Sequence, residues 1–238
     1  MTTQIGKLYL IPTTLGDVPP LEVLPISVKK IIELVDIYIV ENEKTARRFI
    51  KKISPSKKQP SLKIFLLNKF TDPSEIPSFL DPCLKGLNVG LLSEAGCPAV
   101  ADPGADVVKV AHQKNIRVVP LVGPSSIIMA IMSSGMNGQS FAFNGYLPID
   151  NSEKRKELKR LEQLSFSQNQ SQAFIETPYR NNKMLEEICA SLHEQTLVCL
   201  ACDISLPSEY IKTQSVKDWK KNSVDFHKRP TLFILHKE

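Results

Sequence analysis

Short apolar runs of strand length alternate with segments of helical period along the whole chain. Alternation of this kind is typical of βα units around a parallel sheet. In the first half, five predicted strands separated by helices indicate one doubly wound layer. Ser27 is suited to cap one of these helices and Asn115 to end another. The predicted strands are 7–12, 37–41, 63–67, 89–93 and 117–121, and the predicted helices are 27–34, 44–52, 76–85 and 105–114.

The second half has shorter connections, which predict a mixed sheet with antiparallel members. A small-residue turn at 122–126 leads into an apolar helix and is typical of a hinge. We therefore expect an α/β fold of two domains, 1–121 and 122–238. In the second, the predicted strands are 140–144, 172–176, 196–203, 209–212 and 231–236, the helices are 152–164 and 181–192, and polar loops are expected at 54–61 and 165–171.

Composition agrees with a folded chain, because 42% of its 238 residues are hydrophobic and 23% are charged. No uncharged run is apolar enough to cross a membrane, and the N-terminus lacks the pattern of a secretory signal. Five cysteines are an odd number, so reduced thiols and a cytoplasmic location are expected. Cys199 and Cys202 fall on a strand pattern that points them to opposite faces, and no metal site is expected.

The net charge of +5 is concentrated in one segment, because 43–63 holds eight Lys and Arg but only one acid. Such a patch is typical of phosphate-rich partners such as nucleic acid, although a solvated helix face would have the same composition. A second basic run at 154–160 is diluted by acids and predicts an ordinary exposed helix face.

Three loops that follow predicted strands have an unusual composition. In open α/β sheets, ligands bind at the carboxyl ends of strands, where these loops lie. They are 12–17, with two threonines and a glycine, 93–104, with small residues, two prolines and two acids, and 123–126, a Gly-Pro-Ser-Ser turn. None carries the glycine pattern of a dinucleotide site or a P-loop, which excludes those two classes of nucleotide binding.

Four segments resemble motifs of the tetrapyrrole methylase superfamily of S-adenosylmethionine-dependent methyltransferases, and most closely its ribosomal RNA branch. Residues 92–104 are similar to its S-D-A-G-T-P-x-x-S-D-P-G, and 122–126 to its P-G-P-S-A. Residues 143–148 and 174–180 are similar to F-x-G-F-L-P and F-x-E-[ST]-P-x-R. The segments at 11–17 and 40–45 depart from the branch's A-T-P-I-G-N-L and A-E-D-T-R, which bears on RNA specificity rather than on cofactor binding.

This resemblance implies that S-adenosyl-L-methionine binds in a cleft between the two domains, largely through backbone contacts. It also implies a homodimer. The cofactor-binding residues that it indicates are Leu15, Gly96, Cys97, Val100, Ser125 and Ser126. For the substrate side we expect Lys44, Arg47 and Arg48 of the basic segment, together with Glu176 and Arg180, for which a structural ion pair is the alternative.

Methyl transfer to a ribose hydroxyl needs a base to accept the proton. Glu94 and Glu41 follow strands, and of these we expect Glu94 to be catalytic, the alternative being a carboxylate that only caps backbone amides. The leading hypothesis is thus a methyltransferase that acts on ribosomal RNA at a ribose 2′-oxygen. A small-molecule methyltransferase of the tetrapyrrole type, and a cofactor-binding protein without turnover, remain as alternatives.

Overall fold

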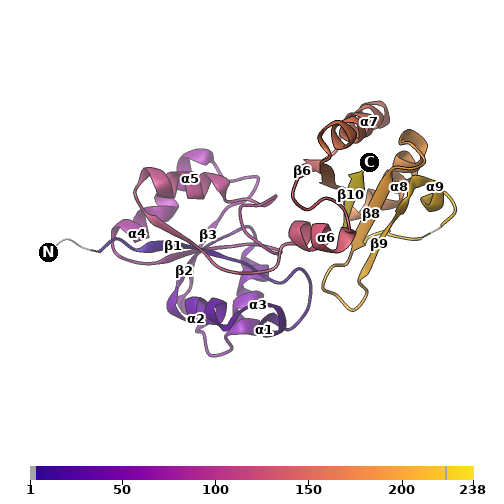
Figure 1. The fold of residues 1–238 in the computed structure, drawn as a ribbon. Helices are drawn as coiled ribbons and strands as arrows, with labels where there is room; N and C mark the ends of the chain where they lie inside the picture. The colour runs from indigo at the N-terminus through magenta and orange to yellow at the C-terminus, as the bar shows by residue number, and fades with distance from the viewer. Residues whose placement is uncertain (1–3, 223) are drawn as a thin grey trace. The chain divides into compact units, whose positions relative to one another are not determined.

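The computed structural model describes residues 4–222 and 224–238, which divide into two units, Met1–Ser125 and Ser126–Glu238 (Figure 1). These units differ from the predicted domains by the four residues 122–125. In the first unit, five parallel strands form a sheet in the order β3-β2-β4-β1-β5. The strands are β1 (Lys7–Ile11), β2 (Ile37–Val40), β3 (Lys63–Leu66), β4 (Val89–Leu92) and β5 (Arg117–Pro120).

Alternate residues of each strand in this sheet serve two separate cores. On one face, Tyr9 and Ile11 pack with α2 (Ile26–Leu34) and α3 (Glu43–Ile53). On the other, Leu8 packs with buried residues of α5 (Ala105–Gln113) and of a 3-10 segment, η2 (Pro73–Leu80). Figure 1 shows the helices on both sides of the strands, as the alternation of apolar runs predicted. The remaining short elements of this unit are α1 (Pro20–Val23), η1 (Gln59–Ser61) and α4 (Asp81–Leu84).

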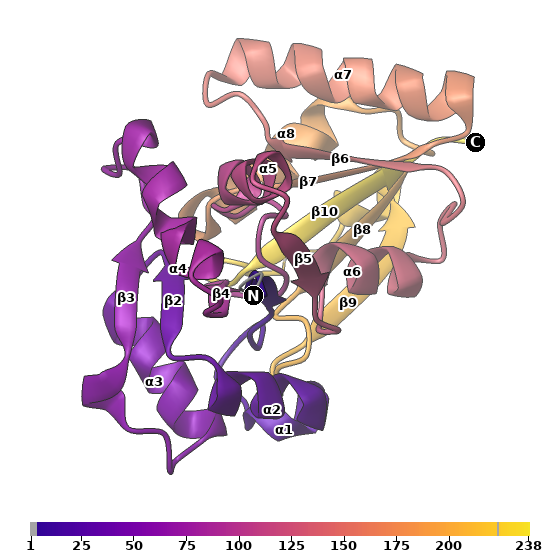
Figure 2. The same cartoon turned by 90° about the vertical axis from the view of Figure 1, so that its left-hand side faces the viewer.

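The second sheet is mixed and has the order β6-β7-β10-β8-β9. Only the β6–β7 pair is parallel among its described strands, because the late connections are short. On one face, α7 packs against β7 and β10 and on α8, whereas α6 packs against β8, β9 and β10 (Figure 2). The bounds are α6 (Ser126–Ser134), β6 (Phe141–Tyr146), α7 (Asn151–Gln168), β7 (Ser171–Ile175), η3 (Pro178–Arg180), α8 (Asn181–Ser191), β8 (Leu197–Cys202), β9 (Tyr210–Ser215), α9 (Val216–Trp219) and β10 (Thr231–His236).

The predicted fold class is confirmed, but several local predictions are wrong. The helix expected at 76–85 is broken into η2 and α4, because Pro77 and Pro82 lack the amide hydrogen that a continuous α-helix requires. Ser27 does not cap α2, which begins one residue earlier after Pro25. The loop expected from residue 165 is helical to Gln168, where Asn169 ends α7 in the left-handed conformation.

Neither Cys199 nor Cys202 has solvent access, since both side chains are buried in β8. Burial raises the pKa of both thiols, which makes them unreactive packing residues. Within the described ranges, no helix is both long and apolar enough to cross a membrane.

Candidate functional site

The three loops singled out in the sequence come together within the first unit. They extend from the carboxyl ends of β1, β4 and β5, which share one edge because the strands are parallel. The backbone amide of Thr13 donates a hydrogen bond to the carbonyl of Gly96 at 3.0 Å, which joins the first loop to the second. The thiol of Cys97 lies 3.4 Å from the carbonyl oxygen of Pro124, which joins the second to the third.

Two glycines allow these loops to approach so closely. Gly96 has a φ of +72°, and a Cβ atom there would lie 3.0 Å from Cδ2 of Leu15 and 3.1 Å from the carbonyl oxygen of Pro124. A Cβ atom on Gly123 would lie 2.3 Å from the ring of Pro12, which no side chain tolerates. The meeting of the loops therefore depends on glycine at both positions.

The middle of the second loop is held in an uncommon backbone conformation. Ala99 and Ala101 both have positive φ, 64° and 55°, although neither is glycine. Between them, Val100 is 53% exposed, which is unusual for a large apolar side chain. Backbone strain and exposed apolar surface of this kind are concentrated at ligand-binding sites.

A cavity of about 300 Å³ opens beside the first two loops and has α3 as one wall. This is the lower end of the size range of small-molecule sites. Asn42 starts α3 by accepting hydrogen bonds from two backbone amides, and Ala46, Ile50 and Ile53 bury its apolar face. Thr45, Arg48 and Lys52 are the polar residues that α3 contributes to the lining of the cavity. The cavity is lined by Thr13, Thr14, Leu15, Gly16, Asp17, Thr45, Ala46, Arg48, Phe49, Lys52, Leu92, Ser93 and Glu94.

Glu94, the predicted base, lines this cavity and is exposed. Both of its carboxylate oxygens accept from the hydroxyl of Thr45, at 2.7 and 2.9 Å. A single hydroxyl proton occupies only part of what a carboxylate can accept. Glu94 therefore keeps capacity to orient a substrate hydroxyl.

A second carboxylate, Asp102, lies beside Ser93 and Glu94 and was missed in the sequence. Burial, together with the negative charges of Glu41 and Glu94, raises the pKa of Asp102 to about 6, although the polar groups of Ser93 and of the Glu94 backbone oppose the shift. A carboxylate with a pKa near neutrality is a better proton acceptor than an ordinary one. The signal was available, since the loop's unusual composition includes two acids, but only Glu94 directly follows the strand.

The cations of the basic segment differ in whether they already form ion pairs or hydrogen bonds within the protein. Arg47 is held by Glu43 at 2.7 Å and by the carbonyl of Gln59 at 2.6 Å. Lys52 pairs with Asp17 at the rim of the cavity. Among the residues that the structure describes, three cations on or beside the exposed face of α3 form no ion pair: Lys44, Arg48 and Lys51. These three, rather than Arg47, are the groups available to a phosphate.

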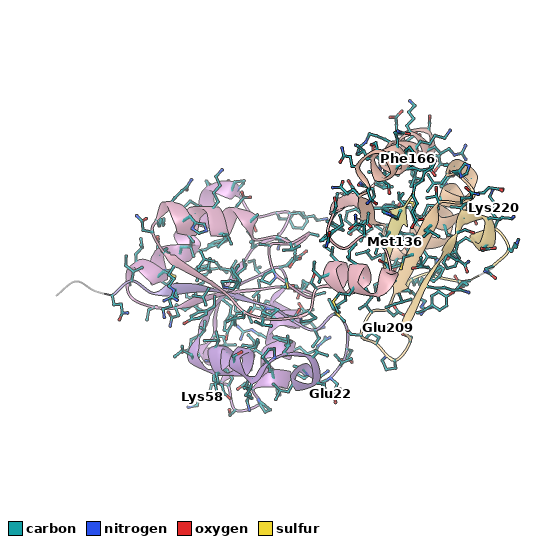
Figure 3. All side chains as sticks on the ribbon, viewed as in Figure 1. Glu22, Lys58, Met136, Phe166, Glu209 and Lys220 are labelled. Carbon is teal, nitrogen blue, oxygen red and sulfur yellow. The ribbon has the colours of Figure 1, made fainter. Side chains whose placement is uncertain are left out.

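Farther along the segment, Lys57 is fixed by Asp36 at 2.6 Å and by the carbonyl of Glu33 at 2.9 Å. Its neighbour Lys58 is exposed on the surface of the first unit (Figure 3). The positive charge of the segment is therefore spread over a helix face and the turn that follows it.

Glu176 and Arg180 of the second unit form an ion pair at 2.7 Å at the end of β7. Lys154 of α7 also faces Glu176, at 3.5 Å, and both of these side chains are 1% exposed. The basic run at 154–160 was expected to be an exposed helix face, and for Lys154 this is wrong. The signal was its spacing, because Lys154 stands four and seven residues before the buried Leu158 and Leu161.

Ion pairing explains why Lys154 and Glu176 can be buried together, with Arg180 36% exposed at the edge of the cluster. The Arg180 guanidinium, the backbone amide of Thr177 and Lys154 outweigh the effect of burial and hold the pKa of Glu176 below its usual range. An isolated charge at this depth would be strongly destabilising. The motif around Glu176 therefore contributes a buried ionic cluster to the second unit.

The residues predicted for the cofactor and for catalysis lie on the strand-end loops of the first unit or at the junction of the units, whereas Glu176 and Arg180 lie in the second unit. Leu15, Gly96, Cys97 and Glu94 are brought together in the first unit. Ser125 ends that unit and Ser126 begins α6, so this pair marks the junction of the two units along the chain.

Comparison with known proteins finds relatives from several bacteria that carry the same name. The chain is 27% identical to ribosomal RNA small subunit methyltransferase I of Escherichia coli over 97% of its own length and 77% of the relative's. The identity is 28% to the protein of the same name in Vibrio cholerae, over 96% and 76%. In Streptococcus pyogenes it is 29%, over 86% and 67%. No family model matches the chain.

Solved structures share the fold at low sequence identity. The methyltransferase CobJ has a TM-score of 0.64 at 13% identity, and the alignment covers 98% of this chain and 94% of CobJ. Cobalt precorrin-4 methyltransferase, CbiF, has a TM-score of 0.62 at 16% identity, covering 97% and 94%. The resemblance predicted from the four motifs is therefore confirmed in both sequence and fold.

Proposed function

Because this chain is a member of the tetrapyrrole methylase superfamily of S-adenosylmethionine-dependent methyltransferases, we propose that it methylates ribosomal RNA of the small subunit at a ribose 2′-hydroxyl. The relatives that match nearly the whole chain carry that substrate in their name. Those names do not state that the acceptor is a ribose 2′-hydroxyl, and this part rests on our proposal.

One observation carries the proposal. One residue predicted for the cofactor (Leu15), one predicted for RNA (Arg48) and the predicted base (Glu94) line the same cavity in the first unit. Leu15 and Glu94 come from the strand-end loops, and Arg48 comes from the basic helix α3. A transferred methyl group and an anionic acceptor must meet at one place, and this cavity offers both sets of groups.

The residues around the cavity fit S-adenosylmethionine. Leu15 and Leu92 offer apolar surface for an adenine ring, and the hydroxyls of Thr13 and Thr14 offer polar partners. The carboxylate of Glu94 suits a positively charged sulfonium. When bound, the cofactor would supply a methyl group carried on a sulfonium sulfur. The bond between sulfur and this methyl group breaks in the transfer, and the sulfur leaves as a neutral thioether.

The protein's own task is to align the acceptor and to remove its proton. We propose that Asp102 is the general base: the 2′-oxygen forms its new bond to carbon while its proton passes to the Asp102 carboxylate. Glu94, fixed by Thr45, would then orient the hydroxyl. This assignment moves the base predicted from the sequence by eight positions within the same loop.

Arg48 and its neighbours would hold the RNA backbone. Phosphate contacts position a nucleic acid without reading its sequence, and unengaged cations on an exposed helix face are suited to this. The departures at 40–45 place these cations differently from those of the ribosomal RNA branch, so the RNA contacts are expected to differ in detail.

The acceptor class can be tested directly. The purified chain is incubated with labelled S-adenosylmethionine and, in parallel, with small ribosomal subunits, protein-free small-subunit RNA, or a tetrapyrrole precursor. We expect label in RNA from the subunits and its recovery as a 2′-O-methylated nucleoside. Label in the tetrapyrrole alone would show the small-molecule activity instead, and no label in any acceptor would support a binding protein without turnover.

A homodimer and a cytoplasmic location remain part of the proposal. Light scattering on the eluting protein measures the mass of the particle. A mass near twice 26.6 kDa is expected, and a mass near 26.6 kDa would contradict the dimer.

A further inference from the structure

The second unit presents an exposed polar and aromatic surface around Tyr179. Tyr179 lies in η3, directly after β7, and its side chain is 68% exposed. The ring of His227 meets it edge-on, with 5.9 Å between centroids. The ammonium of Lys228 lies 5.7 Å from the centre of the same ring. An exposed tyrosine is thus flanked by a histidine and a cation.

These side chains are held in place by their backbones. The backbone amide of Lys228 donates to the carbonyl of Pro178 at 3.0 Å, which ties its loop to the segment of Tyr179. Lys228 also has a φ of 61°, an uncommon conformation for a residue with a side chain. A surface whose geometry is fixed in this way loses little conformational freedom on binding.

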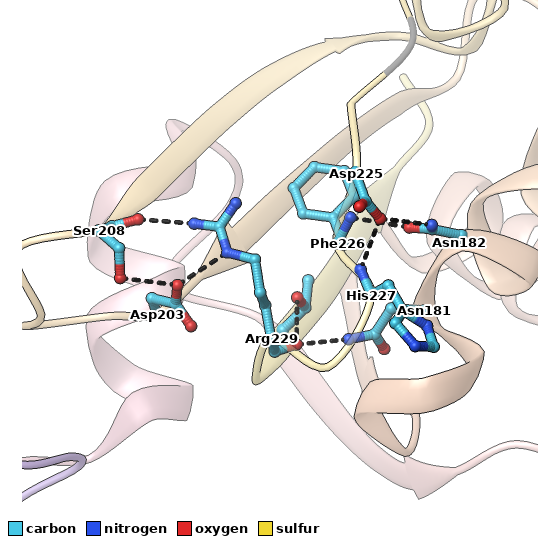
Figure 4. A network of polar contacts seen from close by, with 9 residues as sticks. Asn181, Asn182, Asp203, Ser208, Asp225, Phe226, His227 and Arg229 are labelled. Carbon is cyan, nitrogen blue, oxygen red and sulfur yellow. Dashed lines mark hydrogen bonds and ion pairs between the residues drawn. The ribbon is translucent and has the colours of Figure 1, made fainter.

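Two asparagines at the start of α8 strengthen the connection (Figure 4). Asn181 donates to the carbonyl of Arg229 at 2.6 Å. The side chain of Asn182 donates to Asp225 at 2.7 Å and accepts from the amide of Phe226 at 2.8 Å. Loop 225–229 is therefore clamped to the start of α8 at both of its ends.

Arg229 anchors the far side of the loop. Its guanidinium contacts Asp203 at 2.8 Å and the carbonyl of Ser208 at 2.6 Å (Figure 4). Arg229 is consumed by this structural role, whereas the ammonium of Lys228 has only the ring as a recorded partner among the described residues.

The charges around Tyr179 favour an anionic partner. Lys228 and Lys183 are exposed, and Arg180 lies next to Tyr179 in the chain. The acids nearby are already engaged: Glu176 by its ionic cluster, and Asp225 by Asn182 and the amide of His227. Asp225 is exposed and keeps its negative charge, but with Lys183 and Lys228 the charges that face solvent here are positive in sum.

We propose that Tyr179 is a stacking platform for an unpaired RNA base and that Lys228 contacts the phosphate beside that base. Aromatic rings bordered by cations are the usual means by which proteins hold single-stranded nucleic acid. The proposal rests on the proposed function for its source of RNA, and it adds a contact surface on the second unit to the one on α3.

The test measures binding of a fluorescein-labelled single-stranded RNA of mixed sequence by anisotropy over a range of salt concentrations. Tyr179→Ala should weaken binding by about tenfold, because one stacked base is lost. Tyr179→Phe keeps the ring and should stay within about twofold of wild type on the same grounds. Both substitutions alter an exposed side chain, and a melting curve checks that each variant folds.

Lys228→Ala separates the phosphate contact from the stacking contact. It should flatten the slope of log affinity against log salt by about 0.7, the value for one phosphate on a single strand. Tyr179→Ala should leave that slope unchanged, because stacking releases no counterions.

Equal affinity of Tyr179→Ala and Tyr179→Phe would overturn the platform. So would weaker binding of Tyr179→Ala to whole subunits with unchanged binding to free RNA, which would identify a protein partner. Methyl transfer to subunits by the wild type distinguishes the two failures. Transfer with no Tyr179 effect removes only the platform, whereas a Tyr179 effect without transfer removes only the proposed activity.

Discussion

The strand-end cavity of the first unit and the ionic cluster of the second carry the same kinds of residue in opposite states. In the cluster, Lys154, Glu176 and Arg180 neutralise one another, and two of these side chains are 1% exposed. At the cavity, Arg48 has no ion-pair partner among the described residues, and Asp102, beside the lining residues Ser93 and Glu94, has a raised pKa. Charges that satisfy each other stabilise a fold, and charges left unsatisfied are available for chemistry. Motif resemblance assigned both places to function, and only the first-unit loops were also indicated by their composition and their position after strands.

Removing the proposed base, Asp102, should have the largest effect of any substitution, and this effect should be on turnover. We expect Asp102→Asn to lower kcat by about 10²- to 10⁴-fold, the usual contribution of a positioned base. Binding of S-adenosylhomocysteine should be retained. Asp106→Asn, an exposed acid four residues on, is the matched control and should stay near wild type. A full loss in Glu94→Gln with normal turnover in Asp102→Asn would return the role to Glu94.

The pH dependence of the wild type sharpens the same assignment. The Asp102 carboxyl can accept a proton only when it is deprotonated, so the rate should fall as the pH drops through about 6. Stability changes in the opposite sense. A raised pKa in the folded state means that folding takes up protons between the ordinary value of 3.8 and about 6, so this group lowers stability as pH rises through that window. Asp102→Asn should therefore raise the melting temperature more at pH 7 than at pH 4.

Breaking the ionic cluster should affect stability rather than chemistry. We expect Lys154→Met to lower the free energy of unfolding by about 3–5 kcal/mol, because Glu176 loses part of its compensation while it stays buried. Lys156→Met removes a surface pair with Glu153 and should cost about 1 kcal/mol or less. Denaturant melts of the two variants measure the difference. Equal and small losses would mean that the buried charges are not a structural cluster.

Inserting an atom between the first and second loops should have an intermediate effect, on cofactor affinity. Gly96→Ala adds a Cβ atom 3.0 Å from Leu15 in a left-handed backbone. The added Cβ must displace Leu15 or the second loop, so affinity for S-adenosylhomocysteine should fall by about tenfold, or about 1.4 kcal/mol. Gly135→Ala is the control, because its φ is +70° but its Cβ would meet nothing within 4 Å. If both variants bind equally well, the contact of the loops is irrelevant to the cofactor.

The smallest effect is expected on the basic helix. Arg48→Ala with Lys51→Ala should flatten the salt dependence of RNA affinity by about 0.7 to 0.9 per lost phosphate contact. Lys57→Ala removes a cation already held by Asp36 and should leave the slope unchanged. An unchanged slope in the double variant would remove α3 from the RNA surface.

Much of this architecture could be predicted from the sequence, because strands in buried parallel sheets are continuous apolar runs between helices of regular period. The three loops could be found for a related reason, since close backbone approach requires glycine and other small residues at fixed places. Gly96 and Gly123 show that requirement directly. The resemblance of four motifs then added the cofactor, which composition alone did not indicate.

Other features depend on contacts distant in sequence and could not be predicted from a local pattern. The pKa of Asp102 is set by burial and by Glu41, which lies 61 positions away. Lys154 was assigned to the surface because lysine usually lies there, yet Glu176 compensates its charge in the interior. The surroundings of Tyr179 are set by loop 225–229, which is distant in the sequence and places His227 against its ring.

Cofactor binding by the wild-type chain is the decisive test that the strand-end loops form a methyltransferase site. Calorimetric titration with S-adenosylhomocysteine, with NAD as the control ligand, should show one site per chain with micromolar affinity and no heat from NAD. The absence of binding both to the free protein and in the presence of small ribosomal subunits would contradict a methyltransferase site at the strand-end loops.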